Sequence, residues 1–299
     1  MKSIRILMAA AVIALGYHGT VSAQTAFEGT LTTRVTVAGV DMSQVTEAID
    51  YGKGNIQEQM EAAYRQLPAA DLSRLQTVMT ENPMMGLVVA MTPPKATVYV
   101  KGQTALAHIR GLGYEIIHAH NEQKDEAFIY TASLMPSGDA VTAGYQPSQG
   151  YEGAFAEDKR ITADQFDMAR SAGTADVAGH SCTITTYTPK AGTTEPAGFN
   201  APLHKLVVYS SKDLPKGINF SHPYYLPEES GILRIDIYLD DTTEPSMVYE
   251  VTDIDESPVD DSLLTPRKTE PVYTLSDSDY GMRVLGILLG GLGAMGDGD

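Results

Sequence analysis

The single cysteine of the chain, Cys182, stands two residues after His180 in the stretch VAGHSCTITTYTP. A thiolate beside a histidine is the pair that cysteine nucleophiles use, and residues two apart in a strand point to the same face. Burial in a strand and acidic surroundings both raise the pKa of a thiol, whereas a nucleophile needs a lowered pKa. We therefore interpret Cys182 as a small apolar residue of a half-buried strand, and we predict no catalytic residue there.

His118 and His120 are a second pair of residues able to do chemistry, because alternate residues of a strand share a face. Together with a carboxylate such as Glu122 they would supply part of a metal site. Two histidines without a third placed ligand are a weak metal signal, so the sequence predicts neither a metal nor another cofactor. It also contains no phosphate-binding loop, dinucleotide glycine motif, nucleophile elbow or zinc-protease helix motif.

Acidic residues are concentrated in LDDTTEP and TDIDESPVDD. Both stretches lack the spacing and the bend glycine of an EF-hand, and we interpret them as solvated strand ends. The whole chain has a formal net charge of −17, with 38 acidic and 21 basic residues. Such a charge repels nucleic acid and anionic membrane surfaces, whose binding depends on lysine and arginine. We therefore expect no nucleic-acid partner.

Residues 1–23 have the three parts of a secretory signal peptide. A basic start with Lys2 and Arg5 precedes an apolar run over Ile6–Leu15, and a small-residue cleavage site ends at Ala23. The apolar run is shorter than the roughly 20 residues of a transmembrane helix, and no lipoprotein cysteine stands at the cleavage point. We predict cleavage before Gln24, no transmembrane segment afterwards, and a soluble protein that is periplasmic or secreted.

Short strands dominate the remaining sequence. FEGTLTTRVTV alternates apolar and polar residues with the period of a strand that is wet on one side. Similar short runs fill residues 95–146 and 180–255, and the turns between them are too short for the crossovers of a parallel sheet. The sequence therefore predicts a single α+β, mainly β, domain over residues 24–275 with a largely antiparallel sheet.

Two segments depart from the strand pattern. Residues 55–82 carry apolar residues at helical spacing and are interrupted by Pro68, which predicts a helical insertion of two short helices or one kinked helix. Residues 276–299 hold an apolar run from Val284 to Leu292 that is punctuated by glycine. This segment is either a short docking helix or a flexible tail. Since glycine costs about 1 kcal/mol in a helix interior, we expect a tail that becomes helical only against an apolar surface.

The order of five stretches resembles that of a family of secreted Gram-negative domains of unknown function. These stretches are FEGTL just after the signal peptide, ATVYVKG, DVAGHSC, SGILRIDIYL and VYEVTDIDESPVDDSLLTP. The family is related in fold to the LolA- and LolB-like periplasmic lipoprotein carriers, and the resemblance covers Phe27 to Pro266. It implies a half-open β-barrel, a curved antiparallel sheet with helices covering the concave face. It also implies a protein that sequesters a lipid or acyl group without chemistry.

Three hypotheses on function follow. The first is a module that binds a lipid or another apolar ligand in a half-barrel cavity under the helices. The second is an envelope module with a filled core that docks a protein partner, and the third, ranked last, is a hydrolase or metal enzyme. The ligand-binding residues predicted under the first hypothesis are Met60, Tyr64, Leu67, Leu75, Met79, Met84 and Met85.

Overall fold

The computed structural model describes residues 27–53, 55–81, 89, 92–136, 138–149, 161–192, 203–222 and 226–293. The expected signal peptide over residues 1–23 lies outside the described residues, as do Met84 and Met85. None of the helices within the described ranges has both the length and the apolar character of a membrane span.

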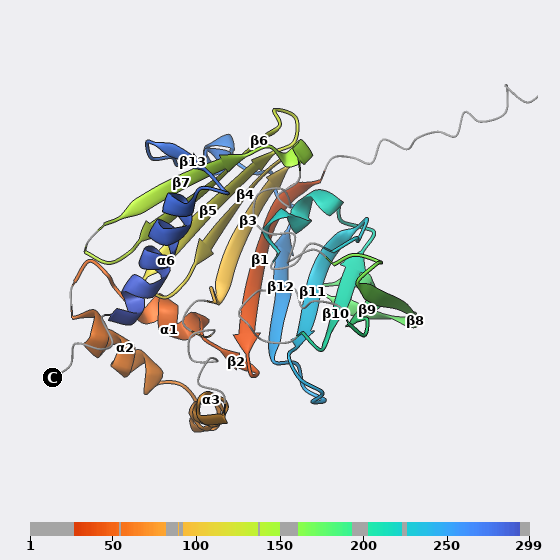
Figure 1. The fold of residues 1–299 in the computed structure, drawn as a ribbon, viewed down its shortest axis with the longest axis horizontal. Helices are drawn as coiled ribbons and strands as arrows, with labels where there is room; N and C mark the ends of the chain where they lie inside the picture. Colours follow the sequence, from red (N-terminus) through yellow and green to blue (C-terminus); the bar gives the residue numbers. More distant parts are fainter. Residues whose placement is uncertain are drawn as a thin grey trace, which may run out of the picture.

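The described residues form a mainly β structure built on one large sheet of 13 strands (Figure 1). Neighbouring strands are antiparallel except at one edge, where β13 lies parallel to β7. The sheet is open, with β13 at one edge and β8 at the other, and β2 (Val40–Asp41) pairs with β1 beside this path. In spatial order the strands are β13 (Val272–Thr274), β7 (Ala140–Tyr145), β6 (Glu126–Ser133), β5 (Tyr114–Asn121), β4 (Thr104–Arg110), β3 (Lys95–Lys101), β1 (Glu28–Val37), β12 (Met247–Asp255), β11 (Gly231–Tyr238), β10 (Lys205–Ser211), β9 (His180–Pro189) and β8 (Phe166–Val177).

The alternation of apolar and polar residues in β1 places them on opposite faces of the sheet, as the sequence predicts. Leu31, Thr33 and Val37 are buried on one face, whereas Thr30 and Arg34 point to the other. We call the first the inner face and the second the outer face. Because residues paired across an antiparallel ladder share a face, the register extends this division across the whole sheet.

The two faces of the sheet differ in character. On the inner face, apolar side chains of β1, β3, β4 and β8–β12 form one core with loop residues such as Leu203, Leu214 and Ile218. On the outer face, Arg34 of β1 pairs with Glu250 of β12 at 3.1 Å, and Glu250 pairs with Arg234 of β11 at 3.2 Å. A sheet that is antiparallel and polar on one side can leave that side in water.

Three helices follow β2 at one end of the sheet: α1 (Ser43–Ala48), α2 (Ile56–Tyr64) and α3 (Ala69–Glu81). The break at Pro68 that the sequence predicts is confirmed. Their apolar residues pack against one another and against Leu112 in the β4–β5 turn. The hydroxyl of Tyr51 accepts a hydrogen bond from the Gly113 N–H in the same turn, at 2.7 Å.

The position of α1–α3 corrects the expectation that this insertion covers the concave face. The three helices bury most of their apolar side chains in a cluster of their own, beyond the ends of the strands (Figure 1), and Val78 of α3 packs on Val37 at the end of β1. Because most of their buried apolar residues lie in this cluster, α2 and α3 stay at the end of the sheet rather than over it.

The cover over β5–β7 is instead α6 (Ser278–Gly293), in the segment expected to become helical only against an apolar surface (Figure 1). Tyr280 and Ile287 of this helix are buried against Tyr114, Ile129 and Val141 of the inner face. The helix forms on an apolar surface, as that expectation requires, because burial of apolar side chains on this strip offsets the low helix propensity of glycine. This is the apolar surface that the sequence alone does not reveal.

Alanine in place of Gly286 and Gly290 should stabilise the protein, because a Cβ at either position meets no atom within 4 Å. Each substitution removes a helix penalty of about 1 kcal/mol, so the double variant should raise Tm by about 2–8 °C. Differential scanning calorimetry measures the change. The matched control is Gly231→Ala, whose Cβ would lie 2.6 Å from that of Leu214 and should lower Tm. A double variant that melts no higher than the parent would contradict the packing of α6.

Candidate functional site

Cys182 lies in strand β9 and is fully buried in the main core. Its thiol donates a hydrogen bond of 3.5 Å to the backbone carbonyl of His180, while the His180 ring lies 3.5 Å from Asp213. Burial raises the pKa of the thiol to about 11, and the nearby Asp176 and Asp213 act in the same direction. The interpretation of this stretch as a strand is confirmed, and the geometry keeps the thiol protonated at neutral pH.

His118 and His120 lie on the inner face of β5, where both rings contact Phe220 of the short helix η3 (Lys216–Ser221). The Nε2 atom of His118 is 2.7 Å from the Tyr145 hydroxyl. Burial, with a smaller effect from His120, lowers the pKa of His118 to about 3, so its ring is neutral at physiological pH. No three His, Cys, Asp or Glu residues within the described ranges are grouped so that they could hold a metal ion. The two rings form an aromatic contact between β5 and η3.

Five of the seven predicted ligand-binding residues lie within the described residues, and these five do not gather on the sheet. Met60, Leu67 and Leu75 come together in the cluster of α1–α3, and Tyr64 packs on its margin. Met79 is 45% exposed on α3. Within the described residues, the methionine and leucine stripe thus forms the interior of a helical cluster.

An apolar strip on the inner face of β5–β7 is the surface that the sequence did not identify. We call it the α6 strip; it consists of Tyr114, Ile116, Ile129, Val141 and Ala143. Tyr280, Val284, Ile287 and Leu288 of α6 cover it. The sequence signal for the cover is the apolar run from Val284 to Leu292, whose helical form depends on this strip.

A buried carboxylate, Glu228, was also not anticipated. It accepts hydrogen bonds from the Tyr187 hydroxyl at 2.6 Å and from the Ser210 hydroxyl at 2.9 Å. Burial and then this carboxylate raise the pKa of Tyr187. Two donors offset the cost of burying the group, so Glu228 ties the loop before β11 to β9 and β10.

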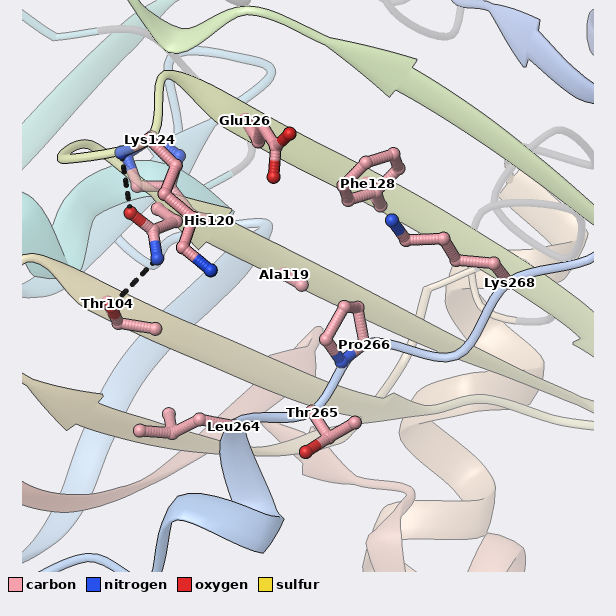
Figure 2. Close-up of a pocket in the computed structure, with 11 residues that line it drawn as sticks. Thr104, Ala119, His120, Lys124, Glu126, Phe128, Leu264, Thr265, Pro266 and Lys268 are labelled. Atoms are coloured by element: carbon pink, nitrogen blue, oxygen red, sulfur yellow. Dashed lines mark hydrogen bonds between the residues drawn. The ribbon is translucent and has the colours of Figure 1, made fainter.

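The outer face carries a hollow of about 350 Å³ over β4–β6 (Figure 2). Residues 261–271, which we call the C-terminal strap, form one wall, and the β5–β6 turn forms the other. Apolar and charged groups both contribute to the lining. The lining residues are Thr104, Ala119, His120, Asn121, Lys124, Glu126, Phe128, Leu264, Thr265, Pro266 and Lys268.

Comparisons with known proteins leave the chain without an assigned family. No family model and no curated protein sequence matches it. Among solved structures, one of PNGF-II in space group C2 is similar over 62% of this chain, with 12% sequence identity and a TM-score of 0.31. The chain spans about 30% of the length of that structure. A likeness at this score assigns neither fold nor activity.

Cys182 should be inert to a thiol reagent such as DTNB in the native protein and reactive after unfolding, because it is buried and protonated. Absorbance of the released thiolate measures the reaction. The matched control is Ser181→Cys in a Cys182→Ser background, which moves the thiol to an exposed neighbouring position of the same strand. Rapid labelling of native Cys182 would contradict the buried geometry.

Stability should fall as pH drops from about 6.5 towards 3, because His118 and His222 are buried with pKa values lowered to about 3. Above its ordinary pKa of 6.5, each ring makes its full contribution to the free energy of unfolding. This contribution is lost progressively as the pH falls from 6.5 to the pKa of about 3 that the ring has in the folded protein. The slope approaches about 1.4 kcal/mol per pH unit for each ring. Urea unfolding at several pH values measures it.

The variant that tests this origin is His118→Gln combined with His222→Gln, which should flatten the pH dependence. His204→Gln is the control, since His204 is exposed. An unchanged slope in the double variant would mean that other groups cause the acid sensitivity.

Proposed function

We propose that this protein is exported to the cell envelope, periplasmic or secreted, and binds a lipid or another apolar ligand without catalysing a reaction. The ligand would lie on the α6 strip, in the place that α6 occupies. The observation that carries the proposal is a glycine-rich helix covering an apolar strip of an open sheet.

The way in which α6 is held supports its displacement. At its start, the Asp279 N–H donates to the Asp277 carboxylate at 3.0 Å, which caps the first turn. Beyond this cap, Gly281, Gly286 and Gly290 lower the intrinsic helix propensity, and apolar packing holds the helix on the sheet. The later turns can therefore leave the strip while the capped end remains attached, and an apolar chain would replace the lost contacts.

The proposal includes a more specific fold assignment, the LolA-like half-open barrel. An open, mainly antiparallel sheet with a helix over its apolar face has the parts of a LolA-like half-open barrel. We place the ligand under α6 rather than along the predicted methionine stripe, because Met60, Leu67 and Leu75 pack against one another. The resemblance to lipoprotein carriers supports a lipid or acyl group as the ligand.

A second candidate function is docking of a protein partner in the envelope. It is favoured by the side of α6 that faces away from the sheet, where Met282 is 68% exposed and Leu285 is 41% exposed. Exposed large apolar side chains close together on one helix are a common feature of interaction surfaces.

Binding of a fluorescent fatty acid tests the carrier proposal. The parent protein should bind the probe, and the Gly286→Ala, Gly290→Ala double variant should bind it about tenfold more weakly, because a more stable α6 competes better for the strip. Ile287→Ser should bind more strongly, since it weakens the cover. Leu285→Ser is the matched control on the exposed side of the same helix and should not change binding.

The carrier proposal would be wrong if neither the parent nor Ile287→Ser took up the probe. Binding that is equal in all variants would place the ligand elsewhere than under α6. Native mass spectrometry of protein purified from its own envelope would then distinguish the two candidates, since a carrier retains a lipid and a docking module retains a protein.

A further inference from the structure

The hollow on the outer face has walls that are fixed in place by hydrogen bonds and ion pairs. On the strap side, the Arg267 guanidinium lies 2.8 Å from Glu115, and the Thr269 N–H donates to the Thr142 hydroxyl at 2.8 Å. Leu264 of the strap packs against apolar residues of β4 and β5. The strap is therefore held on both sides of the hollow's lining residues Thr265 and Pro266.

The opposite wall is equally constrained. In the β5–β6 turn the Lys124 N–H donates to the Asn121 side chain at 2.9 Å, and the Asn121 amide donates to the Thr104 hydroxyl at 3.1 Å (Figure 2). Asp125 accepts hydrogen bonds from the backbone N–H and the hydroxyl of Ser148 at 2.7 and 2.6 Å. A binding site with fixed walls loses little entropy when a ligand enters.

The floor and the strap give the hollow an apolar body. Ala119 and Phe128 are cross-strand partners on the outer face of β5 and β6, and both line the hollow. Leu264 and Pro266 line it from the strap. A volume of about 350 Å³ is at the small end of the range for ligand sites, so the body of a ligand must be small.

Two lysines give the hollow its charge. The ammonium of Lys268 lies 3.3 Å from the centre of the Phe128 ring, and Lys124 stands on the opposite wall (Figure 2). Within the described residues neither ammonium forms an ion pair with a carboxylate. Lys205 and Lys212 share this property, whereas the following described lysines pair with a carboxylate: Lys53, Lys95, Lys101, Lys190 and Lys216.

Glu126 limits the charge of what the hollow accepts. This carboxylate lines the same wall as Lys124, so the three charged side chains sum to one positive charge. The ring of His120 stacks on that of Phe220 on the inner face, with 5.3 Å between the ring centres, so it adds no charge to the hollow. One net positive charge beside an apolar floor matches a single negative charge on a small apolar body, and Glu126 would repel a second one.

We infer that this hollow is a binding site for a small monocarboxylate with an aromatic or short aliphatic body. The body lies on Ala119, Phe128 and Pro266, and the carboxylate pairs with Lys124 or Lys268. Because the hollow and the α6 strip are on opposite faces of the sheet, this site is independent of the proposed function. Binding in the hollow does not require α6 to move.

Fluorine NMR with 4-fluorobenzoate as the probe tests the site, with 4-fluorobenzamide as its neutral counterpart. The parent protein should bind the acid about tenfold more tightly than the amide, because charge-assisted hydrogen bonds form only with the acid. The Lys124→Gln, Lys268→Gln double variant should lose about tenfold in affinity for the acid and little for the amide. Both positions are exposed, so the substitutions leave the fold intact.

The matched control is Lys205→Gln. Lys205 also lies over an aromatic ring, that of Tyr238 at 4.2 Å, but in the other half of the sheet. This variant should bind the acid as the parent does. The inference is overturned if the parent shows no binding at about 1 mM acid. It is also overturned if the acid and the amide bind equally, or if the double lysine variant binds the acid as well as the parent.

Discussion

Burial of the apolar inner face is the requirement on which the rest of this fold depends. An antiparallel sheet that is apolar on one side exposes that side to water unless another part of the chain covers it. Here the β8–β12 half is covered by loops and η3, with Ile218 and Leu214 in the core, and the β5–β7 strip is covered by α6. The contacts of His118 and His120 with Phe220 lie where β5 meets η3. The outer face needs less cover because ion pairs such as Arg34–Glu250 keep much of it compatible with water.

The strands were the most predictable part of the fold. FEGTLTTRVTV and the short runs over residues 95–146 and 180–255 have a period of two and end at turn residues, and each became a strand of the sheet. Strand β8 does not follow from the sequence pattern, because its middle, Arg170–Thr174, carries small and polar residues without alternation, and its pairing with β9 is irregular there. The helical cover was misassigned because periodicity shows that α2 and α3 have an apolar side and does not show what that side contacts.

The candidate sites were less predictable than the fold for a related reason. Cys182 could be interpreted correctly, since its neighbours in sequence are also its neighbours in the strand. The α6 strip and the outer hollow combine residues far apart in the chain, such as Ile129 with Ile287 and Phe128 with Lys268. No local sequence pattern indicates that residues so far apart in the chain are in contact. Local propensity even pointed the other way for α6, where glycine argues against a helix that tertiary burial then stabilises.

The central place of β1 in the sheet has a consequence for the order in which the chain can fold. One neighbour of β1, strand β3, follows it within the same part of the sequence, but the other is β12, and Arg34 lies 216 positions from its partner Glu250. The meander β3–β7 can form from local hairpins, whereas the two halves of the sheet join only after β12 has been made. Until that moment the edges of β1 and β12 that later face each other are unpaired, and the inner face is divided. A chain whose central strand pair joins residues 216 positions apart cannot close its sheet until most of its sequence is available.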